Sequence, residues 1–144
     1  MPEVNKSVLV DFSPDQMFAL VDAVERYPEF LPWCGGASVS YRDAHRTRAT
    51  LAINYRGIKQ SFTTENVKEP GRSISVRLVE GPFRTLDGDW RFAALADRGC
   101  KVELRLRYEF SSKLLAKLVG PVFNYIANTF IDAFVRRARA IYGK

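Results

Sequence analysis

The sequence predicts an α+β fold in which a curved antiparallel sheet of six or seven strands wraps around a long C-terminal helix. Between residues 37 and 110, segments with apolar residues at every second position follow one another, separated by short turns. From residue 121 the period changes to 3.6. Strands joined by such short turns must run antiparallel. Because 144 residues leave room for one core, we expect residues 1–144 to form a single domain.

The chain begins with a strand followed by a helix. Residues 4–10, VNKSVLV, form a short β-branched run. In the segment that follows, Ser13 can cap a helix, Pro14 suits its first position, and Gln16 completes a capping box. These signals predict that a helix starts at Pro14.

The decapeptide YPEFLPWCGG, residues 27–36, is expected to be a connector. Pro28 and Pro32 disfavour helical geometry at the residues before them, so the helix cannot continue far past Tyr27. Prolines also fix the backbone at little entropic cost, which would let the neighbouring aromatic residues close one end of a cavity. The alternative is that these rings only fill the core at the corner between helix and sheet.

The strands are predicted from period-two alternation in residues 48–55, 74–78 and 100–110, and more weakly in 37–43, 59–67 and 85–95, with a turn at 97–99 before the last strand. In residues 85–95 the inner face would carry Leu86, Gly88, Trp90 and Phe92. Gly88 then either leaves space in the interior or marks a β-bulge or bend. The same parity turns Asp87 and Asp89 toward solvent, which argues against a carboxylate pair for catalysis or metal binding.

The C-terminal third predicts a long amphipathic helix over residues 121–142, preceded by a shorter helix that ends at Gly120 and Pro121. A transmembrane span is the alternative, because residues 114–131 carry a charge only at Lys117. The polar stripe through Asn124, Asn128 and Asp132 argues against it.

The net charge and the few potentially reactive side chains exclude few functions, and they do not indicate an enzyme site. A net charge of +6 permits contact with RNA or an anionic membrane. Cys34 and Cys100 are expected to be reduced and buried, and His45 to lie in an exposed turn, so we expect no metal and no catalytic residue. The start of the chain does not resemble an export signal, which favours a cytoplasmic location, with peripheral contact to the inner membrane as a further expectation.

Eight arginines are candidates for contact with RNA or a membrane. They lie on the expected outer faces of the strands and near the end of the long helix: Arg48, Arg77, Arg91, Arg105, Arg107, Arg136, Arg137 and Arg139. The alternative is a solvated surface whose charges are neutralised by acidic residues of the same outer parity.

Three motifs carry a resemblance to a known group: YPEFLPWC, GPFRTLDGDWRF and LVGPVFNYIANTFIDAFVRRA. The chain resembles, over essentially its whole length, the START-like, helix-grip (Bet v 1-like) proteins of the coenzyme Q-binding and oligoketide-cyclase-like group, within the polyketide cyclase/dehydrase and lipid transport superfamily. The resemblance implies a hydrophobic tunnel between sheet and helix. That tunnel would hold ubiquinone or a related prenylated lipid without catalysis and would support respiratory electron transport.

The group allows two other functions. One is that of a ribosome-association toxin of a toxin–antitoxin system, which binds the large subunit and blocks subunit joining. The other is that of an aromatase or cyclase, which would need an acid or base inside the cavity.

We expect a quinone-like lipid as the bound ligand and no other cofactor. The residues expected to line the tunnel are the aromatic residues of the connector and the inward apolar residues of the strands and the long helix. They are Tyr27, Phe30, Leu31, Trp33, Leu51, Ile53, Phe62, Val76, Leu78, Phe83, Leu86, Trp90, Phe92, Leu104, Phe123, Ile126 and Phe130.

Overall fold

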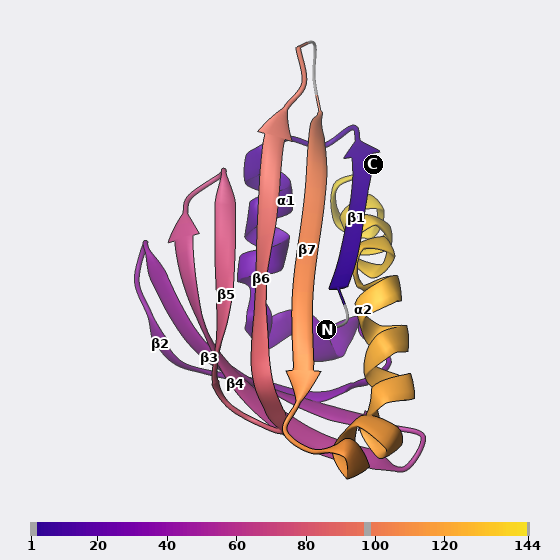
Figure 1. The fold of residues 1–144 in the computed structure, drawn as a ribbon. Coiled ribbons are helices and arrows are strands. Elements are labelled where there is room, and N and C mark those ends of the chain that lie inside the picture. The colour runs from indigo at the N-terminus through magenta and orange to yellow at the C-terminus, as the bar shows by residue number, and fades with distance from the viewer. Residues whose placement is uncertain (1–2, 97–98, 144) are drawn as a thin grey trace.

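A curved seven-stranded antiparallel sheet holds a long helix, as the sequence predicts (Figure 1). The computed structural model describes residues 3–96 and 99–143; the predicted turn at 97–99 lies partly outside them. The strand order is β1-β7-β6-β5-β4-β3-β2. The strands are β1 (Glu3–Val10), β2 (Cys34–Arg42), β3 (Arg46–Tyr55), β4 (Ile58–Glu69), β5 (Ser73–Glu80), β6 (Phe83–Ala94) and β7 (Cys100–Phe110).

Strand β1 forms one edge of the sheet and pairs with β7, from Glu3 opposite Arg107 to Val10 opposite Cys100. The remaining strands follow one another as a meander that ends at β2. Figure 1 shows β2, β3 and β4 sweeping beneath the start of helix α2 (Lys113–Tyr142). The sheet therefore grips the helix on one face.

Helix α1 (Pro14–Asp22) begins where the capping signals predict. The backbone N–H of Gln16 donates to the Ser13 hydroxyl at 3.1 Å, and the Ser13 N–H donates to the Gln16 side chain at 2.8 Å. Both groups would otherwise lack partners at the helix start. This reciprocal pair confirms the predicted capping box.

The connector is more ordered than expected. Residues Val24–Glu29 form a 3₁₀ helix, η1, which contains Pro28. The prediction that the glycine pair lies outside the sheet is wrong, because Cys34 to Gly36 begin β2. An edge strand tolerates such a pair, and the register shift between Cys34 and Gly36 accommodates it.

Helix α2 is continuous, so the predicted break at Gly120 and Pro121 is wrong. A proline inside a helix removes one hydrogen bond, but here the buried residues Val119 and Phe123 lie on both sides of it. Packing of this apolar stripe on the sheet outweighs the local cost. The helix spans about 45 Å at 1.5 Å per residue.

By length and composition alone α2 could cross a membrane, which by itself is weak evidence. Its C-terminal half supplies Phe134 and Ala138, which are fully buried in the core of this fold. Of its most apolar stretch 28% is buried, so burial against the sheet accounts for part of the apolar composition of α2.

Both cysteines are buried and free. Burial raises the pKa of each thiol, which keeps it protonated and unreactive at neutral pH. This agrees with the expectation of reduced, structural cysteines.

Candidate ligand-binding site

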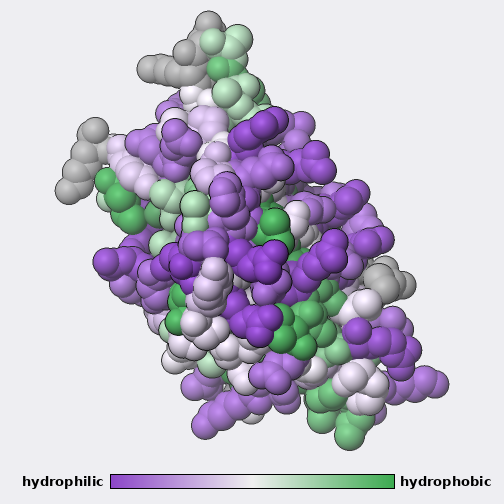
Figure 2. Space-filling model, turned by 90° about the vertical axis from the view of Figure 1, so that its left-hand side faces the viewer, coloured by the Kyte–Doolittle hydropathy of each residue, from purple (hydrophilic) through white to green (hydrophobic). Residues whose placement is uncertain are grey.

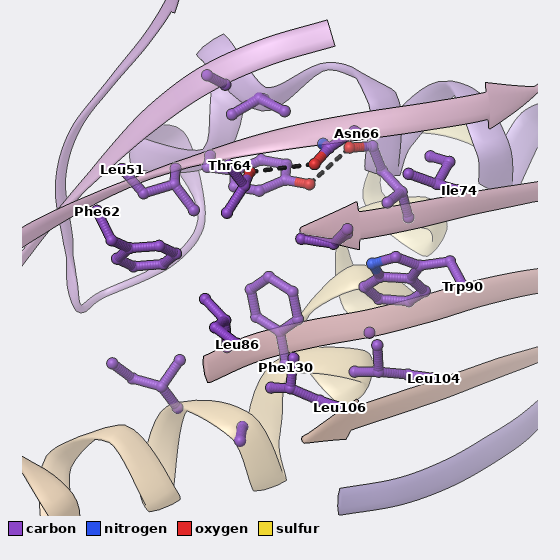
Figure 3. Close-up of a pocket in the computed structure, with 18 of the residues that line it drawn as sticks. Leu51, Phe62, Thr64, Asn66, Ile74, Leu86, Trp90, Leu104, Leu106 and Phe130 are labelled. Atoms are coloured by element: carbon purple, nitrogen blue, oxygen red, sulfur yellow. Dashed lines mark hydrogen bonds between the residues drawn. The ribbon is translucent and has the colours of Figure 1, made fainter. Parts of the chain in front are cut away.

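An apolar cavity of about 90 Å³ lies between the inner face of the sheet and α2 (Figure 3). Its walls come from α1, η1, five strands and the middle of α2. They are formed by Val21, Val24, Tyr27, Trp33, Ala49, Leu51, Phe62, Thr64, Asn66, Ile74, Val76, Leu86, Gly88, Trp90, Leu104, Leu106, Phe123, Ile126, Ala127 and Phe130.

Eleven of the seventeen residues predicted to line a tunnel lie on this wall: Tyr27, Trp33, Leu51, Phe62, Val76, Leu86, Trp90, Leu104, Phe123, Ile126 and Phe130. The other six pack elsewhere: Phe30, Leu31, Ile53, Leu78, Phe83 and Phe92. Three of these contact other rings instead, since Phe30 meets Phe134, Phe83 meets Phe110 and Phe92 meets Phe18. Period-two parity locates the inner face but not which part of it faces the hollow.

The aromatic connector divides between the two roles that its sequence allows. Tyr27 and Trp33 line the cavity, while Phe30 and Leu31 pack outside its wall. The Tyr27 hydroxyl donates to the Val21 carbonyl at 2.5 Å, and burial raises the pKa of this phenol far above its usual range. Tyr27 is therefore a neutral, fixed part of the wall.

Phe130 forms the aromatic side of the cavity together with two tryptophans. Its ring lies 5.8 Å from that of Trp33 and 5.7 Å from that of Trp90, both tilted. Phe130 is only half-buried, whereas both tryptophans are buried. The helix residue is thus the member of this cluster that reaches toward solvent.

Gly88 does not leave spare space, as one interpretation of the sequence proposed. A Cβ atom there would lie 2.7 Å from the backbone oxygen of Arg105 on β7. The pairing with Val76 and Leu106 is regular, so the alternative of a bulge at this residue is also wrong. Close approach of two backbones requires the glycine.

Polar residues on the inner face of β4 were missed by the sequence reasoning, which considered only apolar inward positions. Thr64 and Asn66 belong to the cavity wall, and the Thr64 hydroxyl donates to Asn66 Oδ1 at 3.1 Å. Lys68, two residues further on, is buried and binds Asp22 at 3.1 Å. The available signal was the parity of Phe62, which places all three on the inner face.

The wall offers no group for general acid–base catalysis. Tyr27 is the one ionisable residue among those that line the cavity, and its proton is held by a backbone carbonyl. In the described part of the chain, no cluster of three or more His, Cys, Asp or Glu could hold a metal ion. His45 lies in an exposed turn, as expected. The arrangement favours binding of an apolar molecule over its conversion.

The outer face of the sheet carries interleaved charges. Arg48 lies 3.0 Å from Glu65, and the carboxylates at 87 and 89 bind Arg107 at 3.3 Å and Arg105 at 3.6 Å. This confirms that both aspartates face outward. The face seen in Figure 2 likewise shows hydrophilic residues with hydrophobic ones in separate patches among them.

Of the other candidate arginines, Arg77 and Arg91 are exposed on the sheet, and Arg136 and Arg139 are exposed on α2. Arg137 pairs with Glu29 at 2.5 Å and lies over the Phe30 ring. Hydrogen bonding to Arg137 lowers the pKa of Glu29. Contact of these eight arginines with RNA or a membrane stays a prediction.

Four basic side chains lie on a different surface, in parts of the sequence that contain no acidic residue. We call it the cationic end; it consists of Arg56, Lys59, Lys113 and Lys117, from the β3–β4 turn and the start of α2. The sequence has no Asp or Glu between residues 43 and 65 or between 109 and 132. None of the four forms a salt bridge with a carboxylate of the described residues.

Beside Arg56, the ring of Tyr55 stacks on Tyr125 of α2. The rings of Tyr55 and Tyr125 are parallel, with centroids 5.6 Å apart. Large apolar side chains are also exposed here, with Leu114 at 66% and Leu118 at 54%. Figure 1 shows the β3–β4 turn beside the start of α2.

The fold and the apolar cavity between sheet and helix define a helix-grip protein of the START-like class. More particularly, the chain belongs to the polyketide cyclase/dehydrase and lipid transport family, which matches residues 10–135. The resemblance noted from the sequence motifs is thereby confirmed.

The proteins that this chain resembles fall into different functional classes. The chain is 46% identical, over all 144 residues and the whole of the relative, to the ribosome association toxin RatA of Vibrio cholerae. It is 28% identical over 146 aligned residues to the mitochondrial coenzyme Q-binding protein COQ10 homolog B of Xenopus laevis, covering 99% of this chain and 60% of that one. The ZhuI aromatase/cyclase of a Streptomyces species has the same fold, with a TM-score of 0.79, 17% identity, and coverage of 99% and 97%.

Proposed function

We propose that the protein binds a small apolar molecule, such as a prenylated quinone, between the sheet and α2, and releases it unchanged. The observation that carries this proposal is the cavity between sheet and helix, whose wall is mostly apolar and has no ionisable group except the hydrogen-bonded Tyr27 hydroxyl. Empty apolar space costs stability in a core, so natural cores rarely keep it without a use. The family and the name of the Xenopus relative support the same class of ligand.

The ligand must enlarge the cavity. Pockets for small molecules usually measure about 300–1,000 Å³, whereas this one measures about 90 Å³. Several wall residues are only half-buried, among them Leu51, Val76, Leu106 and Phe130. Separation of α2 from these strands would open the space, and each buried methylene of a ligand tail would return about 0.8 kcal/mol.

Extraction and titration test this proposal. Protein purified gently from its own host should yield a stoichiometric apolar molecule by mass spectrometry, and a short-tailed quinone should bind on titration. Ala127→Leu places a larger side chain in the cavity and should abolish both results. Ala140→Leu, at an exposed position of the same helix, is the matched control and should retain both. Absence of bound molecule and of titration in the unaltered protein would remove the proposal.

Ribosome association is the second candidate, and the relative at 46% identity over its full length favours it. The cationic end supplies a surface for phosphates that the structure leaves without carboxylate partners. It would act from outside the cavity, so the two functions do not exclude each other. A ribosome partner would place the protein in the cytoplasm.

Cosedimentation with ribosomal subunits at two salt concentrations tests this candidate. With four phosphate contacts, counterion release predicts about a 50- to 150-fold loss of affinity for a roughly fourfold rise in salt. Lys59→Ser with Lys117→Ser should weaken binding and flatten this dependence. Lys6→Ser, at an exposed cation on β1 outside both sets of candidate contacts, should change neither. Equal effects of all three substitutions would argue against the cationic end.

A further inference from the structure

Thr64 and Asn66, the polar pair on β4, interrupt a mostly apolar cavity wall. Asn66 is 9% exposed and Thr64 7%. Both lie on the cavity wall, as Figure 3 shows, with Leu86, Trp90 and Leu104 on its opposite side. Burying an amide against apolar groups costs free energy unless its hydrogen bonds are made.

Only half of the Asn66 amide has a partner. Its Oδ1 accepts from Thr64 Oγ1 at 3.1 Å, which fixes the plane and the direction of the amide. No hydrogen bond among the described side chains uses its Nδ2 as a donor. Among the described residues, the buried side-chain atoms without a partner are the hydroxyls of Thr47 and Thr85, so Nδ2 of Asn66 is unpaired but not sealed inside the core. Asn66 therefore presents an unused donor at the wall of the cavity.

The charged side chains near the cavity are paired with opposite charges. Lys68 Nζ is 3.1 Å from Asp22 Oδ1, and Arg42 binds both carboxylate oxygens of Glu25 at 2.8 and 2.9 Å. None of the residues on the wall carries a positive charge. A ligand carboxylate buried here would lack a counter-charge, which is far more costly than burying a neutral carbonyl.

We infer that Asn66 Nδ2 donates a hydrogen bond to a carbonyl oxygen on the polar head of the ligand, and that the site selects neutral carbonyl-bearing molecules over fatty acid anions. This inference rests on the proposed ligand-binding function and names the ligand class. It places the polar head of the ligand at β4. Thr64 is a positioning residue, because it touches the ligand's partner and sets its direction.

Three bicyclic probes of closely similar shape separate the head group from the apolar body: 2-acetylnaphthalene, 2-ethylnaphthalene and 2-naphthoate. Their dissociation constants are measured by calorimetry at neutral pH. The unaltered protein should prefer the ketone to the anion. Asn66→Leu should weaken ketone binding about three- to tenfold more than hydrocarbon binding, the range of one net hydrogen bond. Comparing each variant with the unaltered protein for each probe cancels the different solvation of the probes.

Threonine variants supply the control and a second route if Asn66→Leu does not fold. Thr64→Val frees the amide and should reduce the ketone preference. Thr47→Val removes another buried hydroxyl, on β3 directly opposite Asn66, from a residue outside the cavity wall, and should leave the preference unchanged.

The outcomes distinguish the two proposals. Binding of all three probes with a ketone preference that survives both Asn66→Leu and Thr64→Val overturns the head-group assignment and leaves apolar binding intact. Binding of the anion as tightly as the ketone overturns the selectivity. Failure of every probe to bind, together with an empty native extract, overturns the proposed function itself.

Discussion

The buried ion pair between Asp22 and Lys68 should respond asymmetrically to removal of each partner. The Lys68 side chain is 3% exposed and that of Asp22 25%, at an Nζ–Oδ1 distance of 3.1 Å. Asp22→Asn leaves a buried ammonium without a counter-charge. Such losses cost about 3–5 kcal/mol for fully buried pairs, and the partial exposure of Asp22 reduces the expected value to about 2–3 kcal/mol.

The opposite change should cost less. Lys68→Met keeps the apolar stem and leaves a carboxylate that water can reach, so we expect about 1 kcal/mol or less. The double variant should resemble Lys68→Met, because no unpaired buried charge remains. Urea unfolding measures the free energy of unfolding of the three variants, and their m values should be unchanged. A cost for Asp22→Asn equal to or below that for Lys68→Met would refute the reasoning.

Three further predictions concern packing and pH. Ala127→Leu should raise the free energy of unfolding by about 1–2 kcal/mol, since it buries three more carbons in empty space; thermal unfolding shows it, and a loss of stability would mean that the cavity cannot take the side chain. Gly88→Ala should cost about 2 kcal/mol or more, because its Cβ would meet the Arg105 oxygen at 2.7 Å, and a neutral result by denaturant unfolding would contradict that contact. Hydrogen bonding to Arg42 lowers the pKa of Glu25 to about 2. Its stabilisation, less than about 1 kcal/mol for so exposed a pair, is therefore complete above the unfolded pKa of 4.5 and lost as the pH falls toward 2. The stability difference from Glu25→Gln should vanish over that interval, and a constant difference would exclude this linkage.

The strands and the first helix could be predicted because local physics determines them. Val102, Leu104 and Tyr108 are buried as the alternation of β7 requires, and the capping box at Ser13 forms as its spacing implies. Pro121 shows the limit of such reasoning. Its local penalty is real, yet contacts of α2 with strands distant in the sequence decide that the helix continues.

The cavity wall could be predicted only in part. Parity put Phe62, Leu86 and Trp90 on the inner face, where they line the space. Parity also puts Asn66 on the inner face. However, β4 has polar residues on both faces, so its hydropathy pattern does not distinguish the inner face from the outer one. Whether Phe83 faces the hollow or its neighbouring rings depends on three-dimensional packing, which no spacing in the sequence encodes.

The pairing of β1 with β7 determines when the edge of the sheet can close during synthesis of the chain. Glu3 cannot meet Arg107 until that residue has left the ribosomal exit tunnel, so β1 waits longer for its neighbour than any other strand. Until then β7 would offer an open edge to other nascent or unfolded chains, and such long-range closure is slow. Loss of the pairing residues of β1 should therefore reduce the yield of monomer in the cell more than it reduces the stability of the protein once folded.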